Sequence, residues 1–168
     1  MMQAPHAAVT LDTGETRELS EFYKENPLIL VFLRHFGCIF CREQIAELRP
    51  FKNENIVLVS MGRVQEAAEF KHKMEIPQAM ISDPNKLLYE AFGLRKGSFG
   101  QVLNPTLARK SIRLMKNGHK QGALKHDPWM MAGVFRIEQD GEVSYSHFAS
   151  DISDNLSGSA IAQLLKLK

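Results

Sequence analysis

Residues 28–41 read LILVFLRHFGCIFC, and this stretch decides the fold. Its first six residues are apolar without interruption, which is typical of a strand that is buried on both faces of a sheet. Gly37 breaks this pattern, and from Cys38 to Phe51 the apolar residues return at helical spacing. The two cysteines of the stretch, Cys38 and Cys41, therefore lie where a buried strand gives way to a helix.

Strands and helices continue to alternate along the rest of the chain. The pattern predicts an N-terminal hairpin, two more buried strands, a closing hairpin and six helices, one of them inserted before the closing hairpin. The hairpins are expected at 9–19 and 133–148, the strands at 56–59 and 79–81, and the helices at 20–26, 38–51, 64–74, 83–92, 105–116 and 157–167, with a loop at 95–104. Buried strands joined by helices indicate an α/β fold with a mostly parallel central sheet. An antiparallel C-terminal hairpin with flanking helices is typical of a thioredoxin-like domain.

The length and composition indicate one ordinary globular domain. The chain has 168 residues, 44% of them hydrophobic and 24% charged, so we expect a single domain over 1–168. The longest apolar run, at 28–33, is far shorter than the roughly 18 residues of a membrane span. Residues 1–10 lack the basic and apolar regions of a secretory signal. We therefore expect a cytoplasmic protein with no membrane partner.

The charge is unevenly distributed. Between residues 91 and 126 there are eight Lys and Arg and no Asp or Glu, so a net charge of +2 for the chain leaves −6 for the rest. This stretch predicts either a solvated helix face or a surface for an anionic substrate or partner. It lacks the set of aromatic residues that would stack on bases, so nucleic acid is not expected as a partner.

The spacing of Cys38 and Cys41 points to thiol chemistry. Only the thiolate is nucleophilic, and at an ordinary pKa of about 8.5 roughly 3% of a cysteine is ionised at pH 7. The N-terminus of a helix favours the anion, and the flanking Arg34, His35 and Arg42 are candidates to stabilise it further. After one thiolate attacks, the other cysteine can close a disulfide.

Two other interpretations of the cysteine pair are less favoured. A structural zinc site needs four ligands, and the histidines of the chain do not occur at a recognisable ligand spacing, so no metal is expected. Two inert cysteines that only pack in the core are the other alternative. No phosphate-binding, nicotinamide or flavin fingerprint occurs, so no cofactor is expected and the electrons should come from an external dithiol.

Three segments together resemble the peroxiredoxin-like 2 group, a divergent branch of the alkyl hydroperoxide reductase/thiol-specific antioxidant family. They are residues 31–43 (VFLRHFGCIFCRE), residues 76–94 with their ISDPNK and AFGL motifs, and residues 118–135 with GHKQG, DPW and GVF. The resemblance implies a thioredoxin-like fold and thiol-dependent reduction of a peroxide or another small oxidised substrate. It also implies a dithiol donor such as a thioredoxin, and it leaves a homodimer as an open question.

The resemblance does not decide which cysteine attacks first. Alignment with the peroxiredoxin motif Pro-x-x-x-Thr-x-x-Cys places Cys41 at the peroxidatic position and Cys38 at the threonine, whereas the thioredoxin pattern makes Cys38 the attacker. We treat both as catalytic, with a slight preference for Cys41 toward peroxide. The arginine that ordinary peroxiredoxins carry before the segment at 133–135 is Ala132 here. Arg34 and Arg42 are the candidates to supply the missing charge.

The favoured function is therefore that of a peroxiredoxin-like oxidoreductase whose Cys38 and Cys41 cycle between dithiol and disulfide. Two alternatives stay open at this point. One is a reductase of disulfides or other substrates without peroxidase activity, which the absent arginine favours. The other is a non-catalytic, redox-sensing binding module with a thioredoxin fold, for which the basic stretch would be the docking surface.

Overall fold

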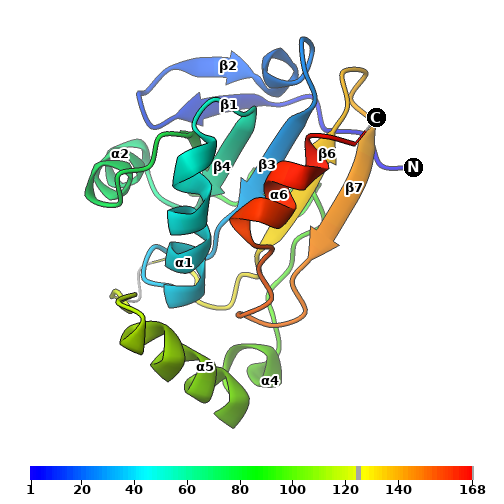
Figure 1. The fold of residues 1–168 in the computed structure, drawn as a ribbon. Coiled ribbons are helices and arrows are strands. Elements are labelled where there is room, and N and C mark those ends of the chain that lie inside the picture. Colours follow the sequence, from blue (N-terminus) through cyan, green and yellow to red (C-terminus); the bar gives the residue numbers. More distant parts are fainter. Residues whose placement is uncertain (124–125, 168) are drawn as a thin grey trace.

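The computed structural model describes residues 1–123 and 126–167, and it is built around one seven-stranded sheet (Figure 1). The strand order is β2-β1-β5-β4-β3-β6-β7. The strands are β1 (Ala8–Leu11), β2 (Thr16–Glu18), β3 (Leu28–Phe32), β4 (Ile56–Ser60), β5 (Ala79–Ser82), β6 (Gly133–Ile137) and β7 (Val143–Phe148).

The helices connect these strands and cover the sheet. They are α1 (Ile39–Leu48), α2 (Val64–Lys73), α3 (Leu87–Ala91), α4 (Phe99–Val102), α5 (Pro105–Lys116) and α6 (Gly158–Leu164), with 3₁₀ turns η1 (Leu19–Phe22) and η2 (Arg49–Phe51). No helix within the described ranges combines the length and the apolar character that a bilayer span requires.

The α/β thioredoxin-like class predicted from the sequence is confirmed, and parallel pairing is concentrated in the middle of the sheet. β3 pairs with β4 and β4 with β5 in parallel, because helices α1 and α2 carry the chain back between them. The remaining pairings are antiparallel, since the two hairpins add β1 and β2 at one edge and β6 and β7 at the other.

Strand β3 divides the core into two layers. Ile29 and Val31 face the cluster that contains the apolar residues of α1 and α6. Leu30 and Phe32 face the opposite cluster, in which α3 and the N-terminal hairpin pack. All five residues of β3 are fully buried, so the strand gives a rigid base to the cysteine-bearing loop that follows it.

Three elements of the structure differ from their sequence-based predictions in extent or type. The helix predicted at 83–92 begins only at Leu87, because Pro84 lies in a preceding turn; the Asp83 carboxylate still accepts hydrogen bonds from the N–H groups of Leu87, Leu88 and Tyr89. The predicted loop at 95–104 contains the short helix α4, which a reciprocal Ser98–Gln101 capping box begins. The helix predicted at 20–26 is the 3₁₀ turn η1.

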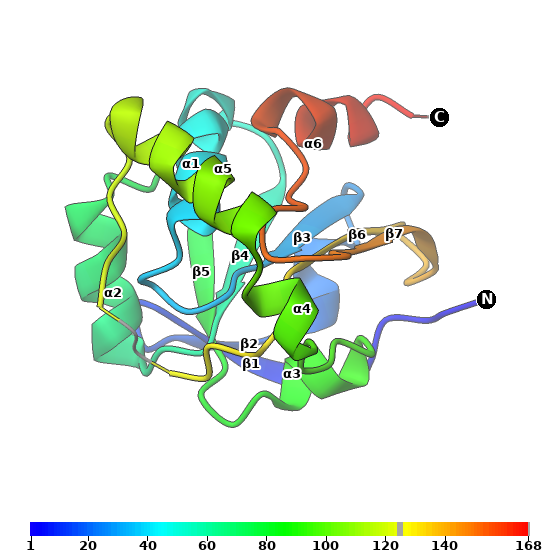
Figure 2. The ribbon, with the colours of Figure 1, turned by 90° about the horizontal axis from the view of Figure 1, so that it is seen from below.

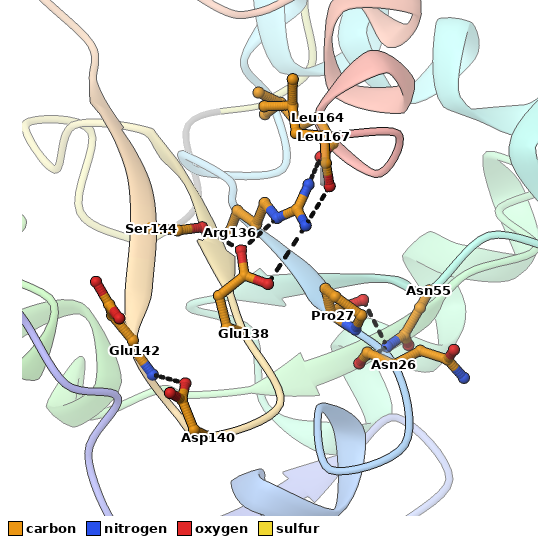
Figure 3. A network of polar contacts seen from close by, with 10 residues as sticks. All are labelled: Asn26, Pro27, Asn55, Arg136, Glu138, Asp140, Glu142, Ser144, Leu164 and Leu167. Atoms are coloured by element: carbon orange, nitrogen blue, oxygen red, sulfur yellow. Dashed lines mark hydrogen bonds and ion pairs between the residues drawn. The ribbon is translucent and has the colours of Figure 1, made fainter.

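A buried arginine joins the closing hairpin to the C-terminal helix (Figure 3). Arg136 on β6 is only 5% exposed, and its Nε donates to Glu138 Oε1 at 2.6 Å. Its two Nη atoms donate to the carbonyl oxygens of Leu164 and Leu167. Leu164 is the last residue of α6 and Leu167 follows the helix, so Arg136 supplies donors to carbonyls at the end of the helix. The hydrogen bond from Arg136 lowers the pKa of Glu138 below its ordinary value.

We expect Arg136→Met to lower the free energy of unfolding by about 3 kcal/mol, because it leaves a carboxylate and two carbonyls without their buried partner. Denaturant unfolding measures the loss. Arg17→Met is the matched control: Arg17 also pairs with a carboxylate, that of Glu21, but its side chain is 34% exposed. That variant should lose no more than about 1 kcal/mol. Equal losses in the two variants would contradict the structural role of Arg136.

Candidate active site

The cysteine pair lies at the junction of β3 and α1, as the sequence predicts. Cys38 is the N-cap residue of α1, with extended backbone angles, and Cys41 lies in the first turn of the helix. Each is a free thiol that is only 2% exposed. The N-terminus of α1 thus lies directly at Cys38, where the helix dipole favours a negative charge.

Arg34 contacts both sulfur atoms of the pair. Its guanidinium Nη1 lies 3.2 Å from Cys38 Sγ, and its backbone N–H donates to Cys41 Sγ at 3.3 Å. The guanidinium is held in place from the other side, because its Nε donates to Met130 O at 3.1 Å and its Nη2 donates to Pro128 O. The segment before β6, where ordinary peroxiredoxins carry their arginine, therefore holds the guanidinium through its carbonyls.

Arg42, the other arginine predicted to stabilise the thiolate, has a different position. Its Nε donates to Phe36 O at 2.9 Å and its Nη1 to Lys120 O at 3.2 Å. These bonds tie the loop before Cys38 to the segment around residue 120. Of the two arginine candidates, the structure thus brings only Arg34 into hydrogen-bond contact with a sulfur of the pair.

The two thiols are made chemically unequal by their hydrogen bonds. A hydrogen bond from the Cys41 thiol, followed by the charge of the nearby Arg34 guanidinium, lowers the pKa of Cys38 to about 6 against the opposing effect of burial. The same hydrogen bond, together with burial, raises the pKa of Cys41 well above its ordinary value. These opposite shifts favour the thiolate form of Cys38 at neutral pH, with Cys41 as the neutral thiol that donates to it.

His35 does not add positive charge to the site, in contrast to the sequence-based expectation. Burial is the main reason that the pKa of His35 is lowered to about 4, with a further contribution from the charge of Arg34. The neutral ring accepts a hydrogen bond from the Gly37 N–H through Nδ1 at 3.1 Å. His35 therefore shapes the turn that leads to Cys38.

The segment at 120–123 closes over this turn. Gly122 N–H donates to Gly37 O at 2.9 Å, and the Gln121 side-chain oxygen accepts from the Ile39 N–H, in the first turn of α1, at 3.2 Å. A Cβ on Gly37 would lie 2.2 Å from Ala123 O, so only glycine allows this close approach. The segment thus fixes the position of the Cys38 loop relative to α1.

A mainly apolar cavity of about 360 Å³ lies next to Cys38. Arg34, His35 and Cys38 contribute to its wall, whereas Cys41 does not. The rest of the wall comes mainly from α4, α5 and two distant loops, through Phe40, Val102, Leu103, Leu107, Ser111, Gln121, Trp129 and Ile152. Sequence reasoning missed most of these residues; the spacing of Leu107 and Leu114 in the helix predicted at 105–116 is the signal that could have shown which face of that helix turns inward. The cavity gives a small molecule space beside the Cys38 sulfur.

Fold, cysteine placement and arginine contact together define a peroxiredoxin-like oxidoreductase of the thioredoxin fold. Residues 42–151 match the family model of the AhpC/TSA antioxidant enzymes, and the chain belongs to this family. The match begins one residue after Cys41, so the cysteine pair itself lies just outside it.

Several curated proteins are similar in sequence. A prostamide/prostaglandin F synthase from Salmo salar is 28% identical over 148 residues, which cover 83% of this chain and 74% of that protein. The chloroplastic thioredoxin-like protein AAED1 from Arabidopsis thaliana is 24% identical over 152 residues, or 82% of this chain and 60% of that protein. The aligned region therefore spans less than two thirds of the plant protein.

Solved structures agree on the fold. Peroxidoxin BcpB from Mycobacterium tuberculosis superimposes with a TM-score of 0.61 at 18% identity, covering 98% of this chain and 91% of that one. A cysteine-to-serine mutant of peroxiredoxin Q from Xanthomonas campestris gives 0.62 at 17% identity, covering 95% of this chain and 88% of that one. The thioredoxin-like fold of peroxiredoxins therefore extends over nearly the whole chain.

The lowered pKa of Cys38 predicts the pH dependence of its oxidation. Because the thiolate is the reactive form, the rate of oxidation by peroxide should rise from acid pH with a midpoint near 6 and reach a plateau above pH 7. Stopped-flow fluorescence can follow the reaction, since Trp129 is the only tryptophan and lines the cavity with Cys38. A midpoint above pH 8 would contradict the described stabilisation of the thiolate.

Proposed function

We propose that the chain reduces peroxides, with Cys38 as the attacking thiolate and Cys41 as the resolving thiol. The observation that carries the proposal is the 3.2 Å contact between the Arg34 guanidinium and Cys38 Sγ at the wall of the apolar cavity. It joins an activated nucleophile, a donor for developing negative charge and space for a substrate.

The reaction follows from this arrangement. The Cys38 thiolate attacks one peroxide oxygen, an S–O bond forms as the O–O bond breaks, and the second oxygen leaves as an alkoxide or hydroxide that takes up a proton. Arg34 is placed to donate to the oxygens as negative charge moves onto them. Cys38 is then a sulfenic acid, and the peroxide has been reduced to an alcohol or water.

Cys41 completes the cycle. Its sulfur attacks the Cys38 sulfenic acid, the thiol proton leaves with the hydroxyl group as water, and a Cys38–Cys41 disulfide forms. An external dithiol, such as that of a thioredoxin, then supplies two electrons and two protons to regenerate both thiols. This order differs from the slight sequence-based preference for Cys41 as attacker. It is favoured because Cys38 lines the cavity and has the lowered pKa, whereas Cys41 has a raised one.

The cavity wall favours peroxides that carry an apolar organic group. Phe40, Leu107 and Trp129 would contact such a group, while Arg34 and Cys38 would face the peroxide oxygens. The similarity to a prostamide/prostaglandin F synthase supports an organic substrate. The alternative of a reductase without peroxidase activity loses its main support, because Arg34 supplies the charge that Ala132 does not.

Intact mass of the wild-type protein tests the proposal. The reduced chain is mixed with one equivalent of hydrogen peroxide or of cumene hydroperoxide and quenched with acid after seconds. We expect the loss of two hydrogens, as the disulfide requires, and faster loss with the aromatic hydroperoxide. An unchanged mass after minutes with both peroxides would overturn the peroxidase function and favour the reductase or the redox-sensing module.

A further inference from the structure

The basic stretch singled out in the sequence surrounds the cavity in the structure. It folds into α4, α5 and the segment after α5, and each of the three contributes residues to the cavity wall. Figure 2 shows α5 lying across α1 with α4 beside it. Five cationic side chains on α5 and just after it are exposed: Arg109, Lys110, Arg113, Lys116 and Lys120.

Large apolar side chains are exposed among these cations. The described residues include eight exposed large apolar side chains, and four of them fall between residues 99 and 115. They are Phe99, Leu103, Ile112 and Met115, with exposures of 68%, 54%, 53% and 50%. Leu103 also lines the cavity, and Ala108, which lines it too, lies one turn from Ile112 on the same stripe of α5. The apolar patch is therefore continuous with the cavity wall.

The cations differ in the direction they face. Leu107 and Leu114 are the buried residues of α5, so Arg109, Ile112 and Lys116, at spacings of three and four, lie on the opposite face. Lys110 is turned toward another part of the chain, where its Nζ donates to Ser153 Oγ at 2.8 Å. Among the ion pairs of the described residues none involves Arg109 or Lys116. These two cations are available to an external anion.

We propose that the exposed face of α4 and α5 docks on an anionic phospholipid surface. The cations would contact the headgroups, and Phe99, Leu103, Ile112 and Met115 would enter the boundary between headgroups and acyl chains. A lipid surface matches this mixture, because it presents negative charge and an apolar layer together. Docking would place the mouth of the cavity at the lipid, where oxidised acyl chains are the organic peroxides within reach.

This proposal concerns surface contact and needs no spanning helix. It departs from the expectation that a membrane is not a partner, which rested on the absence of a long apolar segment and of a secretory signal pattern. It also stands apart from the peroxidase cycle, because binding to lipid uses neither cysteine.

Vesicle co-sedimentation tests the proposal. Reduced wild-type protein is mixed with vesicles of phosphatidylcholine alone, or of phosphatidylcholine with 30% phosphatidylserine, at about 0.1 M and 0.5 M salt. We expect binding only to the vesicles with phosphatidylserine and release at the higher salt. Each cation at an anionic surface strengthens binding about fivefold, so Arg109→Glu/Lys116→Glu should weaken it at least about 25-fold. Phe99→Ser should weaken it as well, because it removes an inserting side chain.

Lys24→Glu/Lys52→Glu is the matched control. It reverses the same number of exposed charges, in the turns before β3 and β4, at the opposite end of these strands from the Cys38 loop. We expect it to bind like the wild type, and thermal unfolding confirms that each variant is folded. Wild-type protein that stays in the supernatant with both kinds of vesicle overturns the proposal, and so does an equal loss in the two double variants. The peroxidase assay in solution is scored separately, so its failure is distinguishable from a failure to bind lipid.

Discussion

Replacing Cys38 by serine is expected to lower the rate of peroxide reduction at least about a thousandfold, because the substitution removes the nucleophile itself. The serine hydroxyl remains protonated at pH 7, whereas the Cys38 thiol has a pKa lowered to about 6. The remaining thiol, Cys41, cannot take over. Burial still raises its pKa after the hydrogen bond to Cys38 is lost, and Cys41 is not among the residues that line the cavity. The measurement is the consumption of cumene hydroperoxide with dithiothreitol as the reductant.

Cys41→Ser is the paired variant, and it should behave differently. Cys38 still faces the cavity and Arg34, so one equivalent of peroxide should be consumed at a rate within about tenfold of the wild type, and the mass should rise by one oxygen. No intramolecular disulfide can form, so excess peroxide should oxidise Cys38 further to the sulfinic acid. If Cys38→Ser kept the activity and Cys41→Ser lost the first oxidation, the order of attack suggested by the peroxiredoxin motif would be correct and ours wrong.

The features of the fold that depend on local patterns were predictable from the sequence. The uninterrupted apolar run at 28–33 identified the central strand, and the return of helical spacing after Gly37 placed the cysteines at the start of α1. The predicted first and last residues of the elements were less accurate where a single residue favours a different local structure from its neighbours. Pro84, for example, favoured a helix start at its own position, whereas the chain makes a turn there and Asp83 caps a helix that begins later.

The chemistry of the site was only partly predictable, because it depends on contacts between distant residues. Arg34 and Arg42 were equivalent in the sequence, both flanking the pair. The carbonyls of Pro128 and Met130, more than 90 residues away, are what direct the Arg34 guanidinium to Cys38. His35 likewise follows a buried strand, and burial makes it neutral, which its position beside two arginines did not indicate. Similarly, the cavity wall combines residues from α1, α4, α5 and two loops, which no local pattern brings together.

This chain has Ala132 where the peroxiredoxin pattern has an arginine, and Arg34 provides a guanidinium at the Cys38 sulfur instead. In this chain the guanidinium comes from the loop just after β3, four residues before Cys38, and the segment before β6 provides carbonyl acceptors in place of an arginine. A positive charge thus lies at the sulfur although position 132 carries an alanine. This makes Arg34 the residue outside the cysteine pair whose removal should cost the most activity.

Arg34→Met is expected to slow peroxide reduction at pH 7 by up to about 30-fold through the thiolate population alone. A full return of the Cys38 pKa from about 6 to an ordinary value near 8.5 would lower the ionised fraction at pH 7 from about 90% to about 3%, and the Cys41 hydrogen bond, which the variant keeps, holds the loss below that limit. The loss of a donor to the leaving oxygen should add a further factor of about ten to a hundred. The rate measured against pH separates the two effects, since the first moves the midpoint upward and the second lowers the plateau.

Arg34→Lys distinguishes this catalytic role from a structural one. Both variants lose the fork that binds the carbonyls of Pro128 and Met130, so both should be destabilised, but the lysine keeps a positive charge near the sulfur. We therefore expect the midpoint for Arg34→Lys to stay closer to 6 than that for Arg34→Met, at comparable losses in unfolding free energy. If both variants kept the wild-type midpoint and lost activity only in proportion to their stability, Arg34 would be a packing residue, and the hydrogen bond from Cys41 and the helix N-terminus would be what activates Cys38.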